Sequence, residues 1–200
     1  RAVDIIPLEI IIRNYAAGSF AVPASWPQEL TRKWKVDVGL GYATPLVVGN
    51  RIYVFARQGE NEVMSALDAA TGRILWQKDF VRDFDASVPS WGMSAAPLVD
   101  GDRLIALVGG EPNAKVMAFN KHTGEELWRA LSSDWEPGYN QPTIITHAGV
   151  RQLIVWHPRA ISSLDPATGK VHWEVPSEVD MGMTVATPVH SGSHLLVTSF

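Results

Sequence analysis

The sequence of 200 residues contains no cysteine, which excludes disulfide bonds, thiolate metal sites and cysteine nucleophiles within it. There are 17 Lys and Arg residues against 21 Asp and Glu residues, with a formal net charge of −4 and no basic run. We therefore expect no nucleic-acid partner and no attraction to an anionic membrane surface. No apolar run approaches the roughly 20 residues that a transmembrane helix needs.

Recognised catalytic signatures are also missing. Residues 39–41 begin like a dinucleotide-binding fingerprint, but neither a third glycine nor a helical pattern follows. No phosphate loop, nucleophile elbow or metalloprotease signature is present. Paired carboxylates such as Glu125 and Glu126 have no neighbours that would separate their pKa values. His190 and His194 flank a Ser-Gly-Ser turn rather than sharing a helix face, so we expect no metal site there.

What the sequence does contain is a ten-residue pattern that occurs three times, at residues 67–76, 119–128 and 164–173. Its Asp or Asn can accept hydrogen bonds from backbone amides two or three residues later and start a turn, and its Gly lies where a positive φ is expected. A short strand ending in Trp follows, so the pattern predicts a hairpin with a loop of about four residues. The repeated structural residues are Asp68, Gly72, Trp76, Asn120, Gly124, Trp128, Asp165, Gly169 and Trp173.

The spacing of the pattern indicates a repeat architecture. The three glycines are 52 and 45 residues apart, and a period in this range is typical of a propeller or a solenoid. Trp34 precedes the three repeated tryptophans at a similar spacing. We expect each tryptophan ring to fill the gap between neighbouring units, because one four-stranded unit cannot bury its own faces.

Each unit is predicted to contain four short strands, called A to D in chain order. In the first unit they cover residues 43–48, 51–55, 63–67 and 73–77, with a two-residue turn at Gly49-Asn50. Two further units and the start of a fourth follow. Proline suits only the edge or the start of a strand. Each unit has one proline at strand A, and these are Pro45, Pro97, Pro142 and Pro188. We therefore expect strand A to be the edge strand that lines a central channel.

The stretch Ala66-Leu67-Asp68-Ala69-Ala70-Thr71-Gly72-Arg73-Ile74-Leu75-Trp76 resembles the tryptophan-docking repeat of the PQQ-like β-propellers. This superfamily includes pyrroloquinoline-quinone (PQQ)-dependent dehydrogenases and BamB-type lipoproteins of outer-membrane assembly. The resemblance implies an all-β propeller of four-stranded antiparallel blades over residues 31–200. Because the family usually closes seven or eight blades, the chain would form about half a ring, cut at both ends. Residues 31–36 would be the last strand of a closing blade, and residues 1–30 an irregular lead.

In this topology the D-to-A and B-to-C connections share one end of the sheets. We expect both sets to be long and irregular, and such loops commonly carry function. One interpretation is an aromatic and cationic funnel that holds a planar quinone, a sugar or a peptide. The other is that aromatics and methionines only plug the channel mouth. The candidate residues are Trp91, Trp135, Tyr139, Asn140, His157 and Arg159.

The resemblance leaves two main functions open. We expect a non-catalytic scaffold, similar to BamB, that presents its loops to a protein partner or a small ligand. The alternative is a quinoprotein alcohol or sugar dehydrogenase that uses PQQ and Ca²⁺. A propeller fused to another domain is a third interpretation. No cofactor is expected from the residues, since PQQ with Ca²⁺ enters through the resemblance alone. The same resemblance implies a periplasmic or otherwise exported protein.

Overall fold

The computed structural model describes residues 25, 31–132 and 135–199. The irregular lead expected over residues 1–30 lies outside this part of the chain, apart from residue 25. The described secondary structure is almost entirely β, in antiparallel sheets whose strand order follows the sequence. The first sheet contains β1 (Leu46–Val48), β2 (Arg51–Gln58), β3 (Asn61–Asp68) and β4 (Ile74–Asp79).

The second and third sheets repeat this plan. The second contains β5 (Leu98–Asp100), β6 (Arg103–Gly110), β7 (Ala114–Asn120) and β8 (Glu126–Ala130). The third contains β9 (Thr143–His147), β10 (Val150–His157), β11 (Ala160–Leu164) and β12 (Val171–Pro176). A two-stranded sheet of β13 (Val189–Ser191) and β14 (His194–Leu196) follows. The predicted architecture of four-stranded antiparallel blades is confirmed.

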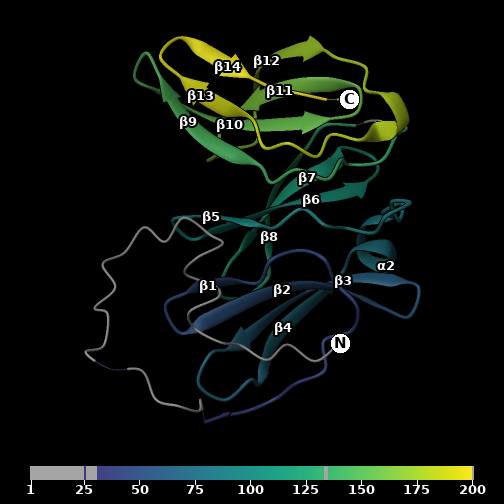
Figure 1. Ribbon diagram of the computed structural model, residues 1–200, viewed down its shortest axis with the longest axis vertical. Coiled ribbons are helices and arrows are strands. Elements are labelled where there is room, and N and C mark those ends of the chain that lie inside the picture. Colours follow the sequence, from purple (N-terminus) through teal and green to yellow (C-terminus); the bar gives the residue numbers. More distant parts are fainter. Residues whose placement is uncertain (1–24, 26–30, 133–134, 200) are drawn as a thin grey trace.

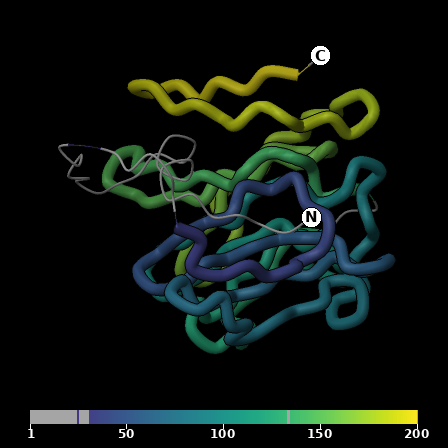
Figure 2. The backbone as a smooth tube through the Cα atoms, turned by 60° about the horizontal axis from the view of Figure 1, so that its bottom comes forward, coloured from purple at the N-terminus to yellow at the C-terminus, as the bar shows by residue number. Residues whose placement is uncertain are grey.

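The sheets follow one another along the long axis of the molecule (Figure 1). Figure 2 shows the β13–β14 hairpin, in yellow, at one end of this array, with the first sheet, in blue, towards the other. The described blades form an open series and do not close into a ring. Each of the four prolines stands directly before strand A of its blade, at β1, β5, β9 and β13, as expected for a residue that cannot donate a ladder hydrogen bond.

The hydrophobic core lies between the sheets. Phe55 and Met64 of the first blade share one cluster with Phe119 of the second. A second cluster joins Val116 of the second blade to Val155 of the third. Because strands B and C are covered on both faces, each blade depends on its neighbours for burial, as in other repeat architectures.

Three tryptophans, Trp34, Trp76 and Trp128, link consecutive blades. In each of them the indole Nε1 donates to a carbonyl oxygen in the C-to-D turn of the next blade, and the six-membered ring lies over the glycine of that turn. The hydrogen bonds are Trp34 to Ala69 (3.0 Å), Trp76 to Lys121 (3.1 Å) and Trp128 to Pro166 (3.2 Å). A Cβ at Gly72, Gly124 or Gly169 would lie 2.6, 2.8 or 2.6 Å from the ring above it. The positive φ expected at these glycines is observed, with values of 73°, 75° and 73°.

The B-to-C connections differ from the sequence prediction, which made them long and irregular. They are short turns at Gly59-Glu60, 111–113 and Pro158-Arg159. The polar residues at 57–62 were assigned to a loop, but Arg57 pairs with Glu62 across the extended strands β2 and β3. Polar cross-strand pairs of this kind continue a strand beyond its apolar segment.

Two further differences concern the connections between blades. A helix that was not predicted, α2 (Phe80–Phe84), follows β4, and the Asp79 side chain caps it by accepting from Arg82 N. A short 3-10 helix, η1 (Asp180–Gly182), follows β12.

The strand expected over residues 31–36 is not found. Trp34 nevertheless occupies the tryptophan position over the first blade, so the ring contact does not require the strand.

Candidate functional site

The candidate surface is the end of the sheets that carries the D-to-A connections, residues 80–97, 131–142 and 177–188, and the short B-to-C turns. We call it the loop face. The opposite end, with the A-to-B and C-to-D turns, is the turn face. Helix α2 lies on the loop face (Figure 1). Long connections on a rigid sheet array are where a scaffold places function.

Trp91 is the most prominent candidate residue, since it is 67% exposed. The backbone before it is fixed by Glu136, whose Oε1 accepts from Ser90 N (2.9 Å) and Ser90 Oγ (2.8 Å). The other oxygen of Glu136 accepts from Tyr139 Oη. This carboxylate therefore joins the loop after β4 to the loop after β8, and it holds the Trp91 segment in place.

We call Ser90, Glu136 and Tyr139 the Glu136 clasp. The pKa values of its Glu136 and Tyr139 follow from burial and from these hydrogen bonds. Burial by itself raises the pKa of Glu136, but the hydrogen bonds from Tyr139 and Ser90 outweigh it, and the pKa is lowered. Burial, together with the hydrogen bond to Glu136, raises the pKa of Tyr139. The pair is thus a carboxylate and a neutral phenol at neutral pH.

The backbone after Trp91 is packed against a partly buried ion pair, Arg57 and Glu62. Arg57 Nε donates to Glu62 Oε1 at 2.8 Å, and Glu62 is buried. A Cβ at Gly92 would lie 3.5 Å from the Arg57 guanidinium. Leu40, which is exposed, exchanges backbone hydrogen bonds with Arg57. An exposed apolar side chain and an exposed indole therefore flank the same partly buried ion pair.

Trp135 and Arg159 form a second exposed group on the loop face. The Arg159 guanidinium carbon lies 4.9 Å from the centroid of the Trp135 ring, within the range of a cation–π interaction. Arg159 Nη1 also lies 3.4 Å from Glu178 Oε1. Half of the predicted site residues, Trp91, Trp135 and Arg159, are thus accessible.

The other three predicted residues are buried beneath this surface. Tyr139 belongs to the Glu136 clasp. Asn140 Nδ2 donates to Trp156 O (2.7 Å) and Thr184 O (3.1 Å), which ties two connections together. His157 is buried, and desolvation lowers its pKa to about 4. These side chains position the loop face rather than forming its outer surface.

Sequence reasoning missed Ser90, Lys115 and Glu136. Glu136 contacts Ser90 across 46 positions of sequence, and no local pattern indicates such a pairing. Lys115 is buried and donates to Trp135 O. A lysine within an otherwise apolar strand was the available signal, because a fully buried lysine is rare without a specific partner.

No group of three or more His, Cys, Asp or Glu side chains that could hold a metal ion occurs among the described residues. In particular, His190 contacts His147 edge to face, with ring centroids 5.9 Å apart. Within the same described ranges, no helix has the length and apolar character needed to cross a membrane.

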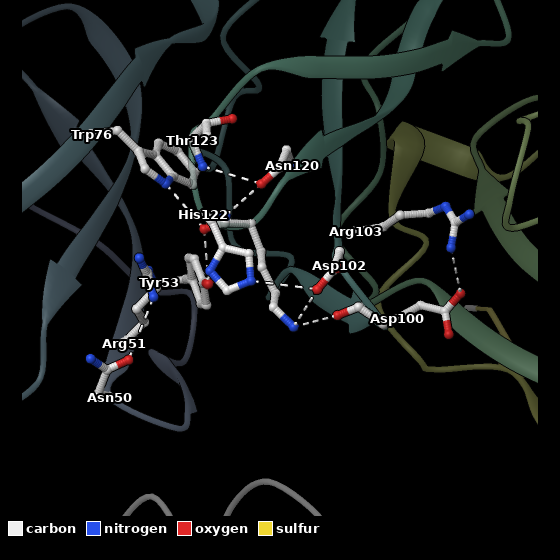
Figure 3. A network of polar contacts seen from close by, with 12 residues as sticks. Asn50, Arg51, Tyr53, Trp76, Asp100, Asp102, Arg103, Asn120, His122 and Thr123 are labelled. Atoms are coloured by element: carbon white, nitrogen blue, oxygen red, sulfur yellow. Dashed lines mark hydrogen bonds and ion pairs between the residues drawn. The ribbon is translucent and has the colours of Figure 1, made fainter.

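The turn face carries a separate polar network, which Figure 3 shows. Tyr53 Oη (3.0 Å) and Trp76 Nε1 (3.1 Å) of the first blade both donate to Lys121 O of the second. The Lys121 ammonium donates to Gly101 O (2.6 Å) and lies 3.1 Å from Asp102 Oδ1. The hydrogen bond from Lys121 lowers the pKa of Asp102. The network links two turns of one blade to the preceding blade, which is a structural role.

Comparison with known proteins connects this architecture to two kinds of propeller. The sequence is 25% identical to outer membrane protein assembly factor BamB of Burkholderia pseudomallei, covering 78% of this chain and 48% of that protein. It is 26% identical to quinoprotein ethanol dehydrogenase of Pseudomonas aeruginosa, covering 74% of this chain and 26% of that protein.

Two solved structures show the same fold. BamB from Moraxella catarrhalis gives a TM-score of 0.57 at 18% identity, covering 84% of this chain and 46% of that one. Quinohemoprotein alcohol dehydrogenase from Comamonas testosteroni gives a TM-score of 0.52 at 20% identity, covering 72% of this chain and 30% of that one. The chain spans less than half the length of each of these relatives. Over residues 26–199 it matches the family described as outer membrane protein assembly factor BamB, and it belongs to that family of PQQ-like β-propellers.

Proposed function

We propose that this chain forms part of a non-catalytic β-propeller that binds a protein partner through its loop face, in the manner of a BamB-type assembly factor. The observation that carries the proposal is Trp91, an indole that is 67% exposed on a backbone fixed by Glu136. Tryptophan is enriched among the residues that dominate binding energy at interfaces. A segment whose backbone is already held in position loses less conformational entropy on binding.

A photo-crosslinking experiment tests this proposal. A photoreactive amino acid is placed at position 91 of the full-length protein, and a matched variant carries it at Lys170, an exposed position on the turn face. After irradiation of intact cell envelopes, we expect one protein to be captured from position 91 and not from position 170. Capture from neither position, or equal capture from both, would count against a partner on the loop face.

The second candidate function is a quinoprotein dehydrogenase, and the identity to a quinoprotein ethanol dehydrogenase favours it. Such an enzyme would use PQQ as the oxidant, held with Ca²⁺ by oxygen ligands. The described residues contain no cluster of carboxylates for that ion. We therefore derive no catalytic step through it from this chain.

Calorimetry on the full-length protein separates the two candidates. PQQ is titrated with and without Ca²⁺, and dye reduction is followed with a panel of alcohols and sugars. Saturable, calcium-dependent binding with turnover would establish the dehydrogenase. Absence of binding would leave the scaffold as the function to pursue through its partner.

We also propose that the ring contacts of Trp34, Trp76 and Trp128 are the tryptophan-docking motif of this family, within a propeller segment that covers residues 31–200. By the same likeness the protein is exported to the periplasm. Fractionation of cells that express the full-length protein tests this, because retention in the cytoplasmic fraction would contradict export.

A further inference from the structure

The loop face and the turn face differ in charge. Within the described residues, the connections of the loop face contain two cations, Arg82 and Arg159. They contain seven carboxylates, which are Glu60, Asp83, Asp85, Glu111, Glu136, Glu178 and Asp180. The turn-face connections contain three of each, namely Asp102, Glu125 and Asp165 with Arg73, Lys121 and Lys170. Negative charge is therefore concentrated at the loop face.

Both cations of the loop face already lie beside one of its carboxylates. Arg82 Nε is 2.8 Å from Asp83 Oδ1, and Arg159 Nη1 is 3.4 Å from Glu178 Oε1. Four other carboxylates have no cation within ion-pair distance in the part of the chain that the structure describes, and these are Glu60, Asp85, Glu136 and Asp180. This surplus of negative charge is complementary to a positively charged surface on another molecule.

The loop face also carries exposed apolar side chains. Five large ones belong to its D-to-A connections, and these are Val88, Trp91, Trp135, Met181 and Val185. The turn-face connections contain no exposed large apolar side chain among residues 31–132 and 135–199. Exposed apolar surface bordered by polar residues is typical of an interaction site.

Trp91 lies next to the unpaired negative charge. The residue before it donates its backbone N–H to Glu136 Oε1 at 2.9 Å. The residue after it packs against the Arg57–Glu62 pair, which adjoins the turn that carries Glu60. The Trp91 segment therefore runs between Glu136 and the Glu60 turn.

Trp135 shows what an indole on this face holds. The Arg159 guanidinium carbon lies 4.9 Å from the centroid of the Trp135 ring. Trp91 is 67% exposed, and no described cation lies over its ring. A lysine or arginine side chain of another molecule can pack its apolar stem on such an indole and place its charge near a carboxylate.

We propose that the loop face binds a polypeptide segment rich in lysine and arginine, with one cationic side chain of that segment against Trp91. This partner chemistry rests on the partner-binding function proposed above, which does not itself specify the charge of the partner. A segment rich in acidic residues would be repelled by the unpaired carboxylates. Complementary charge also makes association faster and dependent on ionic strength.

The test is a fluorescence anisotropy titration of the full-length protein with three labelled synthetic peptides. The peptides share the same leucine and glycine positions and carry lysine, glutamate or serine at the others. We expect the lysine peptide to bind saturably and at least about tenfold more tightly than the serine peptide, and the glutamate peptide not to bind. Added sodium chloride should weaken binding of the lysine peptide.

Two matched variants separate the loop face from the net charge of the protein. Glu60→Gln on the loop face and Glu125→Gln on the turn face each remove one exposed negative charge. Glu60→Gln should weaken binding of the lysine peptide about two- to fivefold, whereas Glu125→Gln should leave it unchanged. Trp91→Ala should weaken it by about tenfold or more.

Equal binding of the three peptides, or equal losses in the two glutamine variants, would overturn the proposed partner chemistry. Photo-crosslinking from position 91 tests the partner-binding function separately. A partner captured there, together with equal binding of the three peptides, would leave that function in place and overturn the cationic partner alone. Absence of capture would count against the partner-binding function itself.

Discussion

At the scale of single residues, the glycine under each tryptophan makes two separate contributions. Gly124 has a φ of 75°, and a Cβ there would lie 2.8 Å from Trp76 Cδ2. Gly149 has a φ of 77° and no atom within 4 Å of such a Cβ. The two glycines share the same backbone conformation, but only Gly124 lies under a tryptophan ring. Comparing the same substitution at both positions therefore separates the effect of the ring contact from that of the backbone.

We therefore predict unequal effects of the same substitution. Gly149→Ala should lower the free energy of unfolding by about 1–2 kcal/mol, the cost of a left-handed backbone with a Cβ. Gly124→Ala should lower it by roughly a further 1–3 kcal/mol, because the ring must also move. Urea unfolding followed by circular dichroism measures both. Equal losses would show that the ring contact contributes nothing at this position.

The indole hydrogen bonds also differ from one blade to the next. Lys121 O accepts from both Trp76 Nε1 and Tyr53 Oη, whereas the described donor to Pro166 O is Trp128 Nε1. Trp76→Phe leaves Lys121 O with the Tyr53 donor, so it should lower the free energy of unfolding by only about 0.5–1 kcal/mol. Trp128→Phe removes the donor to a buried turn and should cost about 1–3 kcal/mol. A larger loss for Trp76→Phe in urea unfolding would contradict this assignment.

At the scale of elements, the clasp at Glu136 makes the order of the loop face depend on pH. Its folded-state pKa lies below the ordinary glutamate value of 4.5. A carboxyl with a lowered folded pKa stabilises the fold above its unfolded pKa, and this stabilisation is lost as the pH falls through the folded value. The Ser90 and Tyr139 hydrogen bonds should therefore weaken only in acid.

We predict that Glu136→Gln reduces the free energy of unfolding at pH 7 and that its difference from wild type shrinks below about pH 4.5. Urea unfolding at a series of pH values measures the difference. Ser90→Ala is the control, because it removes one hydrogen bond and leaves the Glu136 charge. A difference from wild type that stays constant down to pH 3 would refute the role of that charge.

Elements that depend on local pattern were predictable from the sequence, whereas those that depend on distant partners were not. The turn at Asp68 was predicted from its Asx chemistry, and its Oδ1 accepts from Thr71 N at 2.9 Å. The B-to-C turns were misassigned because polar pairs such as Arg57 and Glu62 have no apolar alternation. The Glu136 clasp joins loops 46 residues apart, so only the fold brings its members together.

At the scale of the whole molecule, stability is shared between neighbouring blades rather than held within one core. The two largest hydrophobic clusters each span two blades. Trp34, Trp76 and Trp128 repeat the same link. In an array of this kind the stability is approximately the sum of blade terms and nearest-neighbour interface terms. The cost of removing a tryptophan should therefore depend on whether its ring reaches another blade.

Trp128 and Trp173 occupy the same position of the repeat and test this dependence. Trp128 is 8% exposed and bonds to the third blade, whereas Trp173 is 37% exposed and donates at 2.9 Å to Gln152 Oε1 of its own blade. We predict that Trp128→Ala lowers the free energy of unfolding of this 200-residue chain by about 3–5 kcal/mol. Trp173→Ala should cost about half as much, because less of its apolar surface is buried against residues 31–199. Urea unfolding of the two variants decides the matter. Equal costs would mean that tryptophan stabilises each blade internally, and that the link between blades is incidental.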